Sequence, residues 1–94
     1  MAVTILVVED EEKIARFLEL ELKHEGYSVD KAGNGRDGLE KAESGTYDLM
    51  ILDVMLPEMD GFSVLEALRA GGIAAPVLML TARSELNDRV RGLD

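Results

Sequence analysis

The stretch DLMILDVMLPEMDGFSVLEALR, residues 48–69, contains the two patterns that decide the fold of this chain. A short apolar run from Leu49 to Leu52 ends at Asp53, as expected of a buried strand that emerges into a loop. The loop leads to Asp60, a residue type that favours the N-terminal cap of a helix. Apolar residues then recur at helical spacing, at Val64, Leu65 and Leu68. The segment therefore predicts a strand, a loop and an amphipathic helix that ends at Gly71 and Gly72.

Three other short apolar runs are spaced along the chain, at Thr4 to Val8, Tyr27 to Val29 and Pro76 to Leu80. These runs are continuous or nearly so, whereas a strand with one face in water alternates apolar and polar residues. Continuous runs are typical of a parallel sheet that is buried on both faces. We therefore expect four parallel strands in one sheet.

Helical patterns fill the intervals between these runs. The first ends at Gly26, which suits a left-handed helix end, and places four apolar residues on one stripe, at Ile14, Phe17, Leu18 and Leu22. The second covers residues 36–44, and a fourth begins near Ser84 and aligns Leu86, Val90 and Leu93. The alternation predicts an α/β fold with a doubly wound parallel sheet, built from four strand–helix units in one domain over residues 1–94.

The composition excludes several classes of function. Ten lysine and arginine residues against nineteen aspartate and glutamate residues give a formal net charge of −9, so we expect no direct binding of nucleic acid. The chain has no cysteine and no long apolar stretch, so we expect no disulfide, thiolate site or membrane span. The first residues lack the basic flank and cleavage site of a secretion signal. These observations favour a cytoplasmic globular protein.

Polar side chains follow three of the predicted strands. Glu9 and Asp10 come after the first strand, Asp53 after the third, and Thr81 after the fourth. Ligands of doubly wound sheets bind beyond the carboxyl ends of the strands, so we expect these side chains to share a pocket. Neighbouring carboxylates repel one another and favour a bound cation, and an all-oxygen site suits Mg²⁺ or Mn²⁺. Asp53 is then placed to attack phosphorus and form an aspartyl phosphate.

Each of these residues also has an ordinary explanation. The helix dipole favours acids at a helix N-terminus, where Asp10 would lie with Glu11 and Glu12. An aspartate at a strand end, such as Asp53, is common in turns, and a threonine such as Thr81 is common in strands for its β-branched shape. The combination favours a functional site, because three separate strand ends each supply an oxygen ligand.

Three blocks of the sequence carry a resemblance to a known family. They are ILVVEDEE at residues 5–12, the stretch at residues 48–69, and APVLMLTAR at residues 75–83. In this order and spacing they resemble the signature blocks of response-regulator receiver domains of two-component signalling. They are most similar to the OmpR/PhoB-type subfamily, whose members have winged-helix output domains. The resemblance covers the whole chain and implies a flavodoxin-like receiver fold with strand order 2-1-3-4.

The resemblance also implies roles for the strand-end residues. Asp53 would take a phosphoryl group from a sensor histidine kinase in phosphorelay signal transduction. Asp10 and Asp53 would bind Mg²⁺ directly, Glu9 through water, and Met55 through its backbone carbonyl. Thr81 would donate its hydroxyl to a phosphoryl oxygen. The expected chemistry is limited to self-phosphorylation from a phosphodonor and slow autodephosphorylation, and the parent protein would be a DNA-binding transcriptional regulator.

The sequence departs from the family pattern after Asp94, where the family continues with a fifth strand, a lysine that pairs with the phosphoryl group, and a last helix. One alternative is therefore a phosphorylation-incompetent fragment that binds Mg²⁺ or self-associates. A bare, apolar fourth strand predicts a homodimer or larger assembly through that edge. Another alternative is a metal-dependent phosphohydrolase, but such enzymes carry a second acid two residues after the nucleophile, where this chain has Met55.

Overall fold

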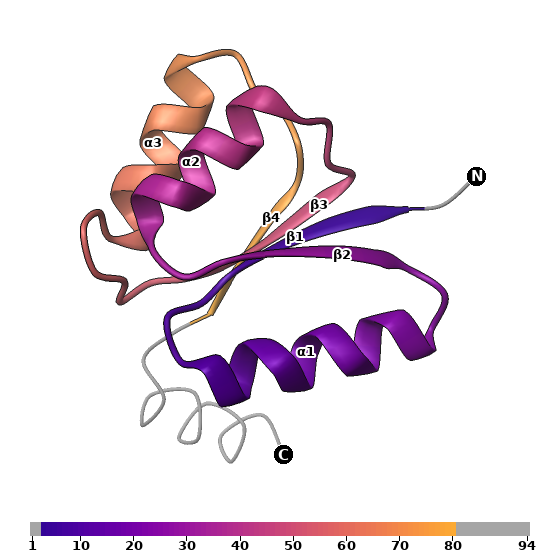
Figure 1. Cartoon of the computed structure of the whole chain (residues 1–94). Helices are drawn as coiled ribbons and strands as arrows, with labels where there is room; N and C mark the ends of the chain where they lie inside the picture. The colour runs from indigo at the N-terminus through magenta and orange to yellow at the C-terminus, as the bar shows by residue number, and fades with distance from the viewer. Residues whose placement is uncertain (1–2, 81–94) are drawn as a thin grey trace, which may run out of the picture.

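The structure is a computed structural model, and it describes residues 3–80 of the chain. One helix covers one face of a central sheet and two helices cover the other face (Figure 1). The elements in chain order are β1 (Thr4–Val8), α1 (Glu12–His24), β2 (Ser28–Ala32), α2 (Gly35–Ser44), β3 (Leu49–Asp53), α3 (Gly61–Ala70) and β4 (Val77–Leu80). Within this range no helix is long and apolar enough to cross a membrane.

The four strands form one parallel sheet in the order β2-β1-β3-β4, which confirms the predicted fold class and strand order. The strand order reverses direction between β1 and β3, the two central strands. Their register pairs Ile5 with Leu49 and Val8 with Leu52. The residues that follow these two strands therefore emerge side by side at the carboxyl edge of the sheet, where ligands of such folds bind.

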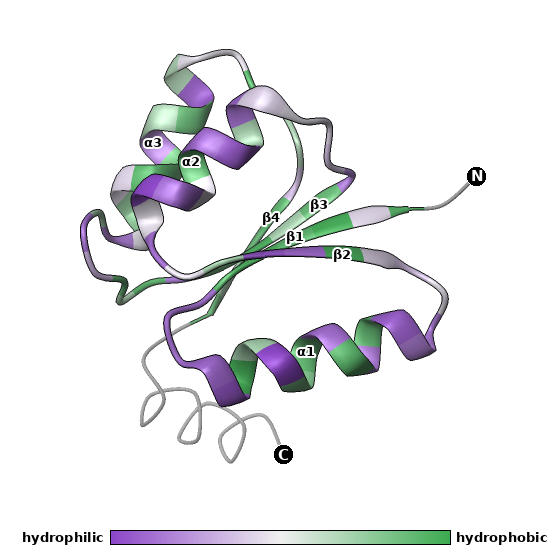
Figure 2. Cartoon of the chain, in the orientation of Figure 1, coloured by the Kyte–Doolittle hydropathy of each residue, from purple (hydrophilic) through white to green (hydrophobic). Residues whose placement is uncertain are grey.

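The central strands are buried on both faces because successive side chains point to opposite sides of the sheet. Ile5 and Val7 of β1 pack with Ile51 toward α1, together with partly buried residues that include Leu18 and Leu22. The larger cluster on the other face fills the space under α2 and α3, and its fully buried members include Leu6, Val8, Met50, Leu52, Val64 and Leu68. Figure 2 shows the continuous apolar character of β1 and β3 that this burial requires.

The two edges of the sheet differ in chemistry. β2 carries three exposed polar residues, Ser28, Asp30 and Lys31, whereas β4 is the four-residue apolar segment VLML. Leu78 of β4 is 54% exposed. Charged side chains on an edge strand discourage pairing with another chain, and apolar ones do not. Of the two edges, β4 is therefore the one whose described side chains do not discourage further pairing.

Several predicted helix ends are confirmed. Gly26 follows α1 with a φ of 95°, in the left-handed region that glycine tolerates. The side chain of Asp60 caps α3 by accepting a hydrogen bond from the Ser63 backbone N–H, at 2.9 Å. Asn34 caps α2 in the same way through the N–H of Asp37, at 2.8 Å. The sequence analysis did not name the Asn34 cap.

Two sequence expectations were wrong in detail. Phe17 does not face the core: it is 61% exposed, and the residues of α1 that pack against the sheet include Leu18 and Leu22, roughly 100° or more around the helix axis from it. β2 begins at Ser28 and runs through charged residues to Ala32, whereas the prediction was Tyr27 to Val29. An edge strand can accommodate such residues because its outer side meets water. The predicted fourth helix lies outside the described residues.

Glu19 links α1 to the edge strand β2. Its two carboxylate oxygens each lie 2.9 Å from a lysine Nζ, one from Lys31 of β2 and the other from Lys23 one helical turn away. The hydrogen bond from Lys31, followed by that from Lys23, lowers the pKa of Glu19 from 4.5 to about 2. The charged form of Glu19 therefore stabilises the contact between helix and strand.

We predict that Glu19→Gln lowers the thermal midpoint at neutral pH and that this deficit depends on pH. In the unfolded chain Glu19 takes up its proton near pH 4.5, but in the folded chain only near pH 2. The stabilisation is therefore fully present above pH 4.5 and is lost as pH falls toward 2, so the two melting curves should converge there. Added salt should also reduce the gap, because both lysines are partly exposed.

Glu43→Gln, at an exposed position of α2, is the matched control and should shift the midpoint little at any pH. A Glu19→Gln deficit that stays constant from pH 7 to pH 2 would contradict the assignment.

Candidate functional site

Three carboxylates meet at the carboxyl edge of the sheet. Glu9 directly follows β1, Asp10 comes next, and Asp53 is the last residue of β3. Each offers an oxygen atom that lies within 4.8 Å of the others. Glu9 and Asp53 are only 5% and 4% exposed, while Asp10 is exposed at the surface. The structure thus brings together the three acidic residues that the sequence placed in one pocket.

Backbone hydrogen bonds hold the two buried carboxylates in place. The Glu11 N–H donates to Glu9 Oε2 at 2.8 Å, and the Met55 N–H donates to Asp53 Oδ1 at 3.2 Å. The chain at each strand end is also anchored to its neighbour. Glu9 N–H donates to the carbonyl of Ala32 on β2 at 3.0 Å, and Val54 N–H donates to the carbonyl of Leu80 on β4 at 2.8 Å. The acid cluster is therefore positioned by all four strands.

The donor chemistry of this cluster fits a hard divalent cation. Carboxylate oxygens are the ligands that Mg²⁺ and Mn²⁺ prefer, and the cluster holds neither a histidine nor a cysteine. Carboxylates this close together repel one another, and burial of Glu9 and Asp53 strengthens the repulsion because the local dielectric is low. A cation between them would relieve that repulsion. Because Asp10 is exposed, the cluster is accessible from solvent on one side, and a site that exchanges ligands needs such access.

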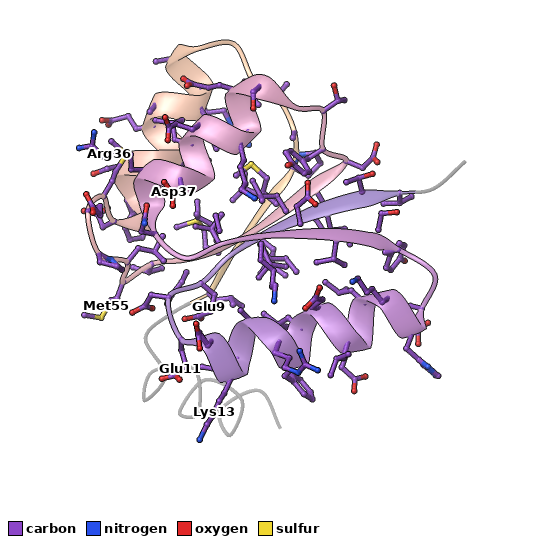
Figure 3. All side chains as sticks on the ribbon, in the orientation of Figure 1. Glu9, Glu11, Lys13, Arg36, Asp37 and Met55 are labelled. Atoms are coloured by element: carbon purple, nitrogen blue, oxygen red, sulfur yellow. The ribbon has the colours of Figure 1, made fainter. Side chains whose placement is uncertain are left out.

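Met55 presents its backbone to the site and its side chain to solvent. The side chain is 64% exposed and projects outward from the same edge of the molecule as Glu9 (Figure 3). A predicted role for its carbonyl is therefore compatible with an apolar side chain at this position. Thr81, predicted to contact the phosphoryl group, lies outside the described residues.

Two hollows flank Asp10 and give access to the cluster from either side. One, of about 590 Å³, runs between the start of α1 and the end of β2 and is lined by Glu9, Asp10, Arg16 and Lys31 among others. The other, of about 710 Å³, lies beside the loop between β3 and α3, with Met55 and Phe62 in its wall. The surface around the cluster is thus charged on one side and largely apolar on the other.

The loop between β3 and α3 is compact and locally strained. Glu58 has a φ of 74°, in the left-handed region that L-residues other than glycine seldom adopt. The flanking residues close a tight turn around it, in which the Met59 N–H donates to the Pro57 carbonyl at 2.8 Å. Gly61 closes the loop through a 2.9 Å bond from its N–H to the Val54 carbonyl. Side-chain type alone did not reveal the strain at Glu58.

Comparison with known proteins identifies the family of this site. Residues 5–94 match the family described as response regulator receiver domain. The chain is 53% identical over 90 residues to the transcriptional regulatory protein PcoR of Escherichia coli, covering 96% of this chain and 40% of PcoR. It is similar to the solved receiver domain of the Francisella response regulator 1452, with a TM-score of 0.84 and 32% identity over 97% of this chain and 75% of that one. It is also similar to the response regulator TrrA of Thermotoga maritima in complex with Mg²⁺-BeF, with a TM-score of 0.82 and 43% identity over 88% and 72% of the two chains.

The chain therefore belongs to the response regulator receiver domain family of two-component signalling. This confirms the resemblance seen in the three sequence blocks. The chain spans about 40% of the length of the curated relatives it matches. Family membership weighs against the phosphohydrolase alternative. Met55 also weighs against it, since this residue stands where such enzymes carry their second acid.

We predict that Glu58→Gly is more stable than Glu58→Ala by about 1 kcal/mol, because only the alanine keeps a Cβ at a positive φ. Both variants lose the exposed 3.6 Å contact between Glu58 and Arg36, so their difference isolates the backbone term. Urea unfolding of the two variants measures it.

The same pair of substitutions at Glu40, exposed within α2, is the control, and there alanine should be more stable than glycine by about 1 kcal/mol. Equal stability of the two variants at position 58 would show that this residue carries no left-handed strain.

Proposed function

We propose that this chain is a phosphoacceptor switch in which Asp53 accepts a phosphoryl group from the phosphohistidine of a sensor kinase. The observation that carries the proposal is the convergence of two buried carboxylates and one exposed carboxylate within 4.8 Å at the ends of β1 and β3. Family membership supports it, since receiver domains act as phosphoryl acceptors for such kinases. The charge of the cluster supports it as well, because phosphoryl transfer depends mainly on positioning and charge neutralisation.

In the proposed site, Asp10 and Asp53 bind Mg²⁺ directly, Glu9 acts through water, and Met55 contributes its carbonyl. The cation, when bound, neutralises negative charge on the transferred phosphoryl group. An oxygen of Asp53 attacks phosphorus as the bond from phosphorus to the imidazole nitrogen breaks, and that nitrogen retains the electron pair. The Met55 N–H donates a hydrogen bond to Oδ1 of Asp53 and so helps to orient the carboxylate for this attack. Thr81 then contacts the phosphoryl group.

The whole protein is proposed to regulate transcription. Its support is the printed name of a relative, the transcriptional regulatory protein PcoR, and the share of that protein that this chain covers, 40%. The net charge of −9 argues that this chain does not itself contact nucleic acid. A DNA-binding activity would therefore belong to another part of the protein, and phosphorylation of Asp53 would control it.

We expect the chain to gain one phosphate when incubated with Mg²⁺ and acetyl phosphate, as measured by intact mass. Asp53→Asn should abolish the gain because the amide is not a nucleophile, and EDTA should abolish it because the charge on the transferred group is then not neutralised. Asp48→Asn, an exposed acid at the opposite end of β3, is the matched control and should leave the adduct unchanged.

An adduct that survives Asp53→Asn would overturn the assignment of the acceptor. Absence of any adduct, with Mg²⁺ binding intact and a longer version of the chain that does become phosphorylated, would favour the alternative of a Mg²⁺-binding or self-associating module.

We also propose that two copies of the chain associate through their β4 edges. The support lies in the contrast between the charged β2 edge and the apolar β4 edge, where Leu78 is 54% exposed. Light scattering coupled to size-exclusion chromatography should show a dimer at micromolar concentration that Leu78→Lys converts to a monomer. Phe17→Lys places the same charge on a similarly exposed apolar residue of α1 and should leave the dimer intact. A compact wild-type monomer at micromolar concentration would refute this proposal.

A further inference from the structure

The loop between β3 and α3 is fastened to the first turn of α2. The carbonyl of Pro57 accepts a second hydrogen bond, at 3.3 Å, from the N–H of Gly35. Gly35 is the first residue of α2, where a helix leaves its N–H groups without partners inside the helix. The strained turn at Glu58 therefore supplies a hydrogen-bond acceptor for the start of α2. In return, the start of α2 holds residues 57–59, the crest of the loop.

Gly35 is also the residue whose lack of a side chain allows this contact. A Cβ built at Gly35 would overlap the carbonyl oxygen of Met59 and would lie 2.8 Å from its carbonyl carbon. These are backbone atoms, so the overlap cannot be relieved by turning a flexible side chain. Either the loop or the start of α2 must move. By contrast, a Cβ at Gly33, two residues earlier, meets nothing within 4 Å.

The loop that Gly35 holds carries the backbone of the acid site. At its start, the Met55 N–H donates to Asp53 Oδ1 at 3.2 Å. At its end, Gly61 approaches the Asp53 carbonyl so closely that a Cβ there would overlap it. The loop is thus held at its start by the hydrogen bond to the Asp53 carboxylate, at its end by the hydrogen bond from Gly61 to the Val54 carbonyl, and at its crest by Gly35. A displaced crest must be absorbed by the residues between these points, which include the peptide group of Met55.

We propose that Gly35 is a positioning residue for the metal site, which sets the Met55 backbone against Asp53 from outside the acid cluster. This inference rests on the proposed function in one respect, namely that the cluster binds Mg²⁺. Gly35 is not a member of the acid cluster, and it acts through the Pro57 and Met59 carbonyls. Backbone partners of this kind orient ligands and contribute to affinity although they do not bind the metal.

The test is the Mg²⁺ affinity of Gly35→Ala, measured by isothermal titration calorimetry at a temperature where each variant is folded by circular dichroism. We expect the dissociation constant to rise about tenfold. Gly33→Ala should leave it unchanged, since its methyl group meets open space. Ala42→Gly, at a buried position near the C-terminal end of α2, should lower the thermal midpoint without changing the affinity of the folded protein.

A wild-type dissociation constant in Gly35→Ala would overturn the inference. So would an equal loss of affinity in Ala42→Gly, since the effect would then follow stability and not position.

A second measurement uses the wild-type chain alone and holds even if Gly35→Ala fails to fold. Coupling between two sites is reciprocal, so Mg²⁺ should slow hydrogen exchange of the Gly35 amide and leave the Gly33 amide unchanged. Binding of Mg²⁺ with no effect on the Gly35 amide would refute the inference while leaving the metal site intact. Absence of Mg²⁺ binding to the wild type would instead refute the proposed function, and with it the inference.

Discussion

The parallel pairing of β1 with β3 is the constraint on which the rest of the structure depends. Both strands are covered on both faces, so their apolar side chains leave no place for a charged group along their length. The chain can turn polar only where the strands end, and the register that pairs Val8 with Leu52 makes these ends coincide. Glu9 and Asp53 therefore lie side by side at the ends of the two strands. The position of the acid site follows from the packing of the core and the register of the sheet.

Holding two carboxylates at 5% and 4% exposure is unfavourable unless other groups compensate for the lost hydration. Part of the compensation comes from the backbone N–H groups of Glu11 and Met55. The geometry of such a site depends on loop conformation as well as on side-chain identity. That dependence explains why an exposed methionine is tolerated two residues after Asp53, and why a left-handed glutamate persists in the same loop.

Features encoded in local pattern could be predicted from the sequence, and features that arise from tertiary contact could not. The carboxyl ends of β1 and β3, the Asp60 cap and the acidic trio follow from local sequence pattern and from the rule for parallel sheets, while the strand order came from family resemblance. The exposure of Phe17 and the presence of charged residues in β2 depend on which elements lie beside α1 and β2. Sequence periodicity does not carry that information. The fastening of the loop to Gly35 joins segments more than twenty residues apart, and no local signal encodes it.

The unequal edges of the sheet also limit how copies of this chain could grow into larger bodies. An open-ended assembly that grows by strand pairing needs two compatible sheet edges on every copy, because each copy must pair with a neighbour on both sides. Charges at Asp30 and Lys31 discourage pairing at the β2 edge, so the proposed association would use only the β4 edge of the described residues. Two copies paired across a twofold axis would each place their β4 edge in the interface, which would close the assembly. The proposed association would therefore end at a dimer and would not extend into a fibre.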